Sequence, residues 1–261
     1  MDDGSTDHTK ELVASFIEKD ARIKYIYQEN AERSAARNNG IENASGEYIC
    51  FLDSDDMFER NHLSELHKFI IRNNNEVTMY FTGASTLKNG VLNKCGSPTI
   101  NDFNPNFFLD NAIIPARVSI HRNIFKKFKF DDRCIIVEDT VLWSEIASEH
   151  SVKYLNKPTI IYQLHEENSV NNKRNNAYRK RLKGLKVLFN DKPVGKIFPR
   201  AVKNKQYINC YFGMARHQAL NNNKLKAILY LIRSLTLNIK TNPRKKEAIL
   251  GIYKVLKNQV F

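Results

Sequence analysis

Apolar residues in the first 170 positions follow two periods, one typical of strands and the other typical of helices. Runs rich in β-branched and aromatic residues predict strands at 22–28, 47–53, 77–83, 152–156 and 159–164. The run EYICFLD at 47–53 is almost wholly apolar, which is typical of a strand buried on both faces of a parallel sheet.

Segments with a helical repeat separate these runs and predict helices at 6–19, 34–43, 60–73 and 138–149. In the first of them Leu12, Phe16 and Ile17 fall at helical spacing, and Ser5 or Thr6 is available as a cap. Because strands and helices alternate, we expect an open α/β layered fold in this part of the chain.

After residue 170 the pattern changes. Only helices are predicted there, at 177–190, 200–221, 224–239 and 243–258. We therefore expect an α/β domain over 1–170 and an all-helical appendage over 171–261. Leu225, Leu229 and Ile232 belong to an apolar stripe on the third of these helices, which we expect to pack on the first domain.

Charge divides the chain at the same place. The 261 residues hold 41 Lys and Arg and 28 Asp and Glu, a net charge of +13. Residues 1–170 hold 19 basic and 26 acidic side chains, whereas residues 171–261 hold 22 basic and 2 acidic ones. The basic tail first suggests a nucleic-acid-binding protein, but no zinc-finger or RNA-binding motif appears and the acidic first part would repel phosphates. Nucleic acid is therefore not an expected partner.

Targeting and redox signals are few. No apolar run reaches the length of a bilayer-spanning helix, and the start MDDGSTDHTK lacks the basic and apolar stretches of a signal peptide. The four cysteines form no CxxC pair, so neither a zinc knuckle nor a redox pair is indicated. We expect reduced thiols in a cytoplasmic protein.

Carboxylates gather at two turns where the predicted fold can bind a ligand. DDGSTD at 2–7 precedes a helix, whose first N–H groups suit an anion or a polar ligand edge; otherwise it is a simple cap and turn. DSDD at 53–56 ends the apolar strand, at the edge where α/β sheets bind ligands. Its oxygens suit Mg²⁺ or Mn²⁺, and the alternative is a solvated acidic turn.

Two further candidates lie later in the chain. Glu138 and Asp139 begin a predicted helix, either as an ordinary acidic first turn or as the seat of a general base whose pKa we expect to be depressed. His165 is either a surface residue or a group that touches a metal or phosphate. It belongs to no zinc-protease motif, because Ser169 stands where a second histidine is required.

The motifs also follow one another in a specific order. DDGSTD is followed by NAERSAARN at 30–38, GEYI leading into DSDD at 46–56, and ED at 138–139 before VLWSEIA. In order and spacing the chain strongly resembles the family 2 glycosyltransferases over about residues 2–170. The resemblance implies a GT-A fold with a mostly parallel, Rossmann-like sheet. It also implies a nucleotide-sugar donor, a divalent metal (Mn²⁺ or Mg²⁺) and inversion at the anomeric carbon by a single displacement.

The resemblance assigns expected roles to individual residues. Asp3 looks like the residue that hydrogen-bonds the nucleobase, and Arg37 is similar to a position that lines the nucleotide pocket. Asp139 matches the catalytic base. The metal ligands that the resemblance implies are Asp55, Asp53 and His165. Asp53 also resembles an acid on the ribose side, and His165 a histidine near the diphosphate.

The resemblance has one departure at its start. Members of the family carry a further strand and helix before the DDGS turn, and that strand is central in their sheet. We therefore expect a gap in the sheet here, with an unpaired neighbouring strand. We expect the sequence to be truncated, to start at a misassigned position, or to receive the strand from elsewhere. The alternative to an active enzyme is an inactive scaffold that binds a partner.

Partners follow from the resemblance and from the charge. A UDP-sugar is the donor that the resemblance implies, with a glycan or lipid-linked acceptor in bacterial surface polysaccharide synthesis. Basic helices are attracted to anionic leaflets by about 1 kcal/mol per well-placed charge. We therefore expect peripheral contact of the basic tail with the inner face of the plasma membrane, in addition to helix packing.

Overall fold

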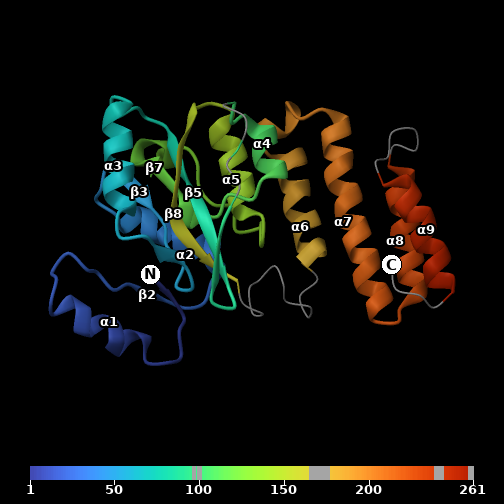
Figure 1. Ribbon diagram of the computed structural model, residues 1–261, viewed down its shortest axis with the longest axis horizontal. Coiled ribbons are helices and arrows are strands. Elements are labelled where there is room, and N and C mark those ends of the chain that lie inside the picture. Colours follow the sequence, from blue (N-terminus) through green and yellow to red (C-terminus); the bar gives the residue numbers. More distant parts are fainter. Residues whose placement is uncertain (96–97, 99–101, 165–176, 238–243, 258–261) are drawn as a thin grey trace.

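The structure is a computed structural model that describes residues 1–95, 98, 102–164, 177–237 and 244–257. Strands and helices alternate up to residue 164, and helices alone follow from residue 177 (Figure 1). The structure therefore confirms the α/β class followed by a helical region. None of the described helices combines the length and the apolar character that are needed to cross a membrane.

The main sheet has the order β3–β7–β5–β8–β4, with β6 paired to β5. Its strands are β3 (Tyr48–Cys50), β4 (Met57–Phe58), β5 (Met79–Lys88), β6 (Val91–Lys94), β7 (Val118–His121) and β8 (Val152–Gln163). Within this sheet β5 and β8 pair in parallel, and the other pairs are antiparallel.

The sheet is therefore mixed, which corrects the expectation that it is mostly parallel. The physical reason lies in the segment between β5 and α5. It supplies β6 through a tight turn at Asn89 and Gly90, which both have positive φ, and it supplies β7 against β3. The short β5–β6 connection returns the chain antiparallel to the preceding strand. After a longer connection, β7 also runs antiparallel to its neighbours β5 and β3.

The strand predicted at 47–53 was expected to be buried on both faces of a parallel sheet, but β3 lies at the edge of the main sheet. Ile49 and Phe51 are buried, but Tyr48 and Cys50 are half-buried and Leu52 is exposed. In the described part of the chain β3 pairs only with β7, while β1 (Asp2–Asp3) pairs only with β2 (Tyr27–Gln28) in a separate parallel sheet. Both strands thus have a partner, and the expected gap in the sheet stays a prediction.

Helices and 3₁₀ turns alternate with the strands in this part of the described chain. They are α1 (Thr9–Ile17), α2 (Glu32–Asn43), α3 (His62–Arg72), α4 (Pro105–Asp110) and α5 (Glu138–Ala147), with the 3₁₀ turns η1 (Pro115–Arg117) and η2 (Arg122–Lys126). Trp143 of α5 is fully buried in an aromatic core with Phe81 and Phe130, and its indole N–H donates to the carbonyl of Ile113 at 2.8 Å. In contrast, α1 lies to one side and buries no residue (Figure 1).

The four helices predicted in the second half are confirmed. They are α6 (Ala177–Lys186), continued by the π-helical turn η3 (Val187–Asp191) and the 3₁₀ turn η4 (Pro193–Lys196), then α7 (Arg200–Leu220), α8 (Lys224–Thr236) and α9 (Lys245–Leu256). They follow one another away from the sheet, with α8 and α9 at the far end (Figure 1). The proposed division at 170–176 lies outside the described residues and stays a prediction.

The apolar face of α8 is not the one that the sequence pattern indicates. Ala227, Leu231 and Ser234 are the residues that α8 buries. Leu225 and Leu229, which were expected to pack on the first domain, are exposed. The residues of both sets recur at helical spacing, so hydrophobic periodicity alone does not show which of the two faces is buried.

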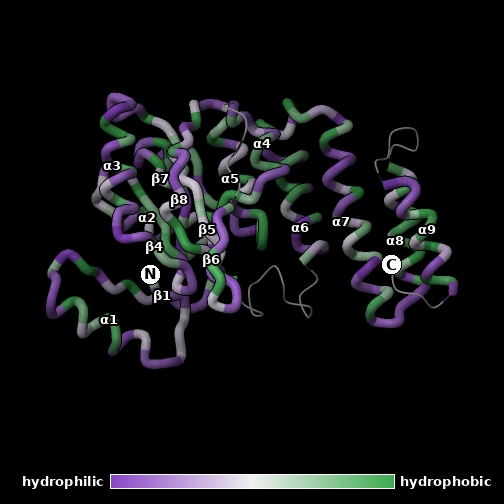
Figure 2. The backbone as a smooth tube through the Cα atoms, in the orientation of Figure 1, coloured by the Kyte–Doolittle hydropathy of each residue, from purple (hydrophilic) through white to green (hydrophobic). Residues whose placement is uncertain are grey.

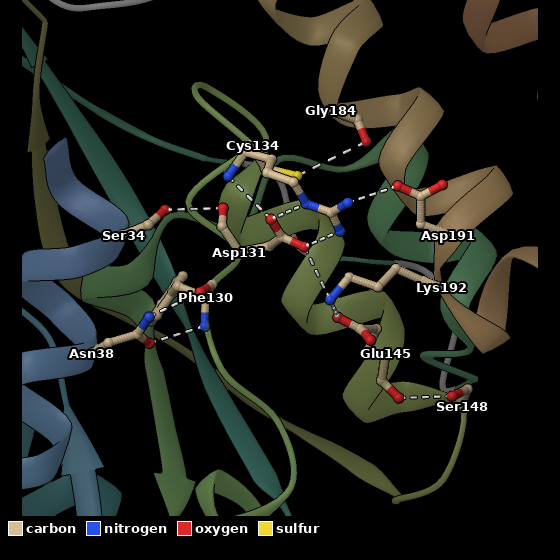
Figure 3. A network of polar contacts seen from close by, with 11 residues as sticks. Ser34, Asn38, Phe130, Asp131, Cys134, Glu145, Ser148, Gly184, Asp191 and Lys192 are labelled. Atoms are coloured by element: carbon tan, nitrogen blue, oxygen red, sulfur yellow. Dashed lines mark hydrogen bonds and ion pairs between the residues drawn. The ribbon is translucent and has the colours of Figure 1, made fainter. Parts of the chain in front are cut away.

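A charged network joins the helical region to α5 and to the loop before it (Figure 3). The Arg133 side chain donates to both Asp131 carboxylate oxygens, at 2.9 and 2.8 Å, and to Asp191 at 2.8 Å. Lys192 lies 3.3 Å from the Asp131 carboxylate and 3.1 Å from that of Glu145. Asp131 thus forms ion pairs with one arginine of the α/β part and with one lysine of the helical part.

Replacing Asp131 tests this junction. We expect Asp131→Asn to lower the free energy of unfolding by about 2 kcal/mol, because hydrogen bonds to charged groups are lost. Hydrogen bonds from Arg133 are the largest cause that holds the pKa of Asp131 at about 2. The stabilisation is therefore complete above the unfolded pKa near 4 and disappears as the pH falls toward 2.

Urea unfolding at pH 7 and pH 2.5 measures both effects. Asp132→Asn is the matched control, because Asp132 is the next residue and is exposed. Equal losses for the two variants, or a loss at Asp131 that persists unchanged at pH 2.5, would contradict the role of the network.

Candidate functional site

A cavity of about 580 Å³ adjoins the DDGS turn, α2 and the end of β3. Its walls include Asp3 from β1, Arg37 from α2, and the segment from Ile49 to Ser54. Three of the residues that the sequence singled out, Asp3, Arg37 and Asp53, therefore line one cavity although they are far apart in the chain.

The DDGS turn is fixed by hydrogen bonds from its own neighbourhood. One Asp3 oxygen accepts from the Gln28 side chain at 2.7 Å and from the Ala31 backbone N–H at 2.9 Å. Asp2 accepts from the Ser5 N–H at 2.8 Å and from the Tyr25 hydroxyl at 2.5 Å. The turn thereby holds Asp3 at the wall of the cavity.

Glycine is required at position 4. Gly4 has φ +86°, in the left-handed region, and a Cβ there would lie 2.9 Å from the backbone nitrogen of Asn30. A side chain at this position would therefore be strained by its own backbone and would also push the DDGS turn away from the start of α2.

Arg37 connects two carboxylates that come from distant parts of the sequence. Its Nη2 donates to both Asp53 oxygens at 2.9 Å, and its Nη1 donates to Glu138 Oε1 at 2.9 Å. The side chains of Arg37 and Glu138 are only 10% and 4% exposed. The guanidinium also lies 5.5 Å from the centre of the Phe130 ring. Arg37 is thus the buried cation that connects the DSDD turn to the start of α5.

Glu138 is a site residue to which the sequence analysis gave no separate role. It begins α5 next to Asp139, and Arg33 approaches the same Oε1 at 3.7 Å. Its other oxygen, Oε2, is buried and has no hydrogen-bond partner among the described residues. The available signal was the pair of acids at a helix start, but sequence cannot show which of the two meets an arginine.

The pKa of Asp139 is raised, not depressed as expected from its place at a helix start. Burial is the largest cause and the charge of Glu138 the next, and together they raise the pKa of Asp139 to about 7. The Thr140 N–H, 2.6 Å from the carboxylate, and the charge of Arg37 lower it by less. A carboxylate with such a pKa is suited to accept a proton near neutral pH.

The DSDD turn concentrates negative charge that Arg37 offsets only in part. Burial first, and then the charges of Asp55 and Asp53, raise the pKa of Asp56 to about 6. Its Oδ1 is buried and has no hydrogen-bond partner among the described residues. Hard oxygen ligands with unbalanced charge fit a divalent cation such as Mg²⁺ or Mn²⁺.

The described residues contain no group of three or more His, Cys, Asp or Glu side chains that is arranged to hold a metal ion. His165, the third expected ligand, lies outside the described residues. Mg²⁺ in phosphate-transfer sites is commonly held by one or two carboxylates together with substrate phosphates, and the DSDD turn offers such a pair in Asp53 and Asp55.

Comparison with known proteins agrees with this geometry. The family model described as Glycosyl transferase family 2 matches residues 1–125. The UDP-Glc:alpha-D-GlcNAc-diphosphoundecaprenol beta-1,3-glucosyltransferase WfgD of Escherichia coli is 32% identical over 176 residues, which cover 66% of this chain and 67% of WfgD. The chain therefore belongs to glycosyl transferase family 2.

Two other relatives show how far the similarity extends. The GalNAc(5)-diNAcBac-PP-undecaprenol beta-1,3-glucosyltransferase of Campylobacter jejuni is 29% identical over 266 residues, covering 92% of this chain and 78% of that protein. An uncharacterized glycosyltransferase of Rickettsia felis is 36% identical over 166 residues, covering 60% of this chain. The match covers 26% of the Rickettsia felis protein, so the chain spans about a quarter of its length.

Removing the bridging cation tests the organisation of the site. We expect Arg37→Met to lower the free energy of unfolding by about 3 kcal/mol, because it leaves Glu138 buried and charged without its partner. Adding Glu138→Gln should recover part of this loss, since the uncompensated charge is then gone.

Arg33→Met is the matched control, because Arg33 lies on the same helix and approaches the same carboxylate at the longer distance of 3.7 Å. Its expected cost is below about 1 kcal/mol. Chemical denaturation of the unsubstituted protein, Arg37→Met, Glu138→Gln, their double variant and Arg33→Met measures these differences. Equal costs at Arg33 and Arg37, or additive effects at Arg37 and Glu138, would contradict the bridging role.

Proposed function

We propose that the protein is an inverting, metal-dependent glycosyltransferase that moves a sugar from a UDP-sugar to a lipid-linked glycan acceptor. The observation that carries the proposal is the Arg37 bridge, which brings the cavity lined by Asp3 and Asp53 together with the start of α5. This arrangement supports nucleotide binding and proton removal within one site. The activities named for the Escherichia coli and Campylobacter jejuni relatives, both on undecaprenol diphosphate-linked glycans, support this substrate class and a role in bacterial surface polysaccharide synthesis.

The cavity is proposed to hold the nucleotide part of the donor. Asp3 is held at its wall by Gln28 and the Ala31 N–H, where a carboxylate oxygen can accept from a nucleobase N–H. Arg37 lines the same cavity, and its contacts with Asp53 fix the acid that we assign to the ribose or metal side. Because these groups are already held by the protein, donor binding costs little further ordering.

The DSDD turn is proposed to hold the divalent cation, through Asp55 and Asp53, with His165 as the third proposed ligand. Such a cation supplies electrostatic stabilisation for the negative charge that develops on the leaving diphosphate. The protein's own contribution is to keep Asp53 oriented by Arg37 and to keep several carboxylates close together at the turn after β3.

Asp139 is proposed to act as the general base. An acceptor hydroxyl is a weak nucleophile at neutral pH, and a carboxylate that removes its proton in the transition state contributes about 10²–10⁴-fold to the rate. Attack on the face of the sugar opposite the diphosphate inverts the anomeric carbon. Burial and Glu138 raise the affinity of Asp139 for that proton, which matches the task.

The first test removes the proposed base. We expect Asp139→Asn to lower kcat by about 10²–10⁴-fold in a transfer assay with UDP-glucose and a detergent-solubilised undecaprenyl diphosphate glycan. The thermal midpoint should stay the same or rise, because a buried ionisable group is removed. In the unsubstituted protein kcat/KM should fall about tenfold per pH unit below about pH 7, since the base must be deprotonated.

Asp132→Asn, at an exposed residue, should leave both the rate and its pH profile unchanged. If Asp139→Asn retains full transfer activity, Asp139 is not the base. If kcat/KM begins to fall only near pH 4, the general base is a carboxylate of ordinary pKa.

The second test concerns the cation. Chelation by EDTA should abolish transfer, and Mn²⁺ or Mg²⁺ should restore it. Asp55→Asn should raise the metal concentration for half-maximal activity at least about tenfold, since a charged ligand is lost. Calorimetric titration of Mn²⁺ in the presence of UDP should show the same weakening without relying on turnover. Full activity in EDTA would exclude the metal-dependent proposal.

A further inference from the structure

The last two helices each carry a second apolar face that no part of the described chain covers. On α8, the buried residues are Ala227, Leu231 and Ser234, which pack toward α7 and α9. Leu225, Leu229 and Ile232 form the other face and are between 45% and 71% exposed. Since these three residues are spaced by four and three positions, they form a continuous stripe along α8.

The same arrangement is repeated on α9. Its buried residues are Ala248, Gly251 and Val255. Ile249, Tyr253 and Leu256 repeat the spacing of four and three positions and are between 53% and 63% exposed. Apolar residues rarely line an exposed helix face in this regular way unless the face meets a partner.

Basic side chains border both stripes. At about 100° per residue, Lys226 and Arg233 lie beside the α8 stripe, and Lys246 and Lys257 lie beside the α9 stripe. All four are exposed. Residues 224–257 hold nine Lys and Arg but a single acidic residue, Glu247. Figure 2 shows the alternation of hydrophobic and hydrophilic positions along both helices at the end of the molecule farthest from α1.

We propose that the exposed stripes of α8 and α9 form a docking surface for an anionic phospholipid bilayer. This inference deepens the proposed function, because a lipid-linked acceptor is presented at such a surface. The stripe residues enter the boundary between headgroups and acyl chains, while the bordering lysines contact lipid phosphates. A second copy of the chain is a poor occupant of the same faces, since it brings like charges together.

The binding mode is interfacial. A helix with apolar residues on one face and cations beside them lies in the plane of the membrane boundary. The cations are attracted by the anionic leaflet, and the buried apolar area holds the helix there. Electrostatic attraction and apolar burial come from different side chains, so substitution can remove each of them separately.

Sedimentation with vesicles tests this surface without donor or acceptor. The full chain is mixed with vesicles of phosphatidylcholine, with or without phosphatidylglycerol, at low and high salt. We expect binding to the anionic vesicles, weaker binding at high salt, and little binding to phosphatidylcholine alone. Replacing Leu229, Ile232, Tyr253 and Leu256 together by Gln should lower the bound fraction at least tenfold.

The matched control places the same kind of change elsewhere. Leu12 and Phe16 on α1 are 62% and 50% exposed, and the double variant Leu12→Gln with Phe16→Gln should bind vesicles like the unsubstituted protein. Replacing Lys226, Lys246 and Lys257 by Gln should weaken binding and reduce its salt dependence. Circular dichroism checks that each variant keeps its helices.

Several results would overturn the proposal. They are a failure of the unsubstituted protein to bind anionic vesicles, equal loss of binding in the α1 variant, and a stripe-dependent dimer in sedimentation velocity without lipid. Transfer to the detergent-solubilised acceptor is measured separately. Lost vesicle binding with intact transfer refutes only the membrane surface, whereas intact binding without any transfer refutes only the proposed activity.

Discussion

The pairing of one buried cation with a buried and a half-buried carboxylate is the constraint on which the α/β part of the protein depends. Asp53 follows β3, Glu138 begins α5, and Arg37 on α2 contacts both. An uncompensated charge in this place would cost several kcal/mol, so the three elements have one favourable arrangement around the guanidinium. The walls of the cavity are therefore fixed by electrostatics as well as by apolar packing.

The same pairing shapes the acid–base chemistry nearby. Because Arg37 is bonded to Asp53 and Glu138, its charge only partly offsets the burial of Asp139, whose pKa rises. At the DSDD turn Asp56 also has a raised pKa, since burial and the two other aspartates outweigh the attraction of the same arginine. One cation among several carboxylates thus leaves the pKa values of both Asp139 and Asp56 raised.

The α/β part and the helical region differ in how their charged side chains are placed. The acidic first part holds its carboxylates near Arg37 or in the network of Asp131 with Arg133 and Lys192, which joins it to the helical region. The helical region has almost no acids, so most of its cations stay in solvent. One face of α8 and one face of α9 are buried, and apolar residues on their other faces remain exposed.

Much of this could be read from the sequence alone, because the relevant signals are local. Helical periodicity located α2, α3, α5 and the four helices after residue 170, and the ordered acidic motifs indicated the family. Asp3, Arg37 and Asp53 were named as candidates from their motifs, and the structure places all three in the wall of one cavity. Their roles remain proposals.

Other features depended on contacts between distant residues, which periodicity does not encode. Only the tertiary structure showed that β7 pairs antiparallel with β3, that Glu138 rather than Asp139 meets Arg37, and that burial overrides the helix dipole at Asp139. It also decided which of two apolar faces α8 buries. The sequence by itself determined the helices and the ionisable side chains that the site contains. The tertiary structure decided which of these side chains are buried and which ion pairs they form, because these depend on contacts between distant residues.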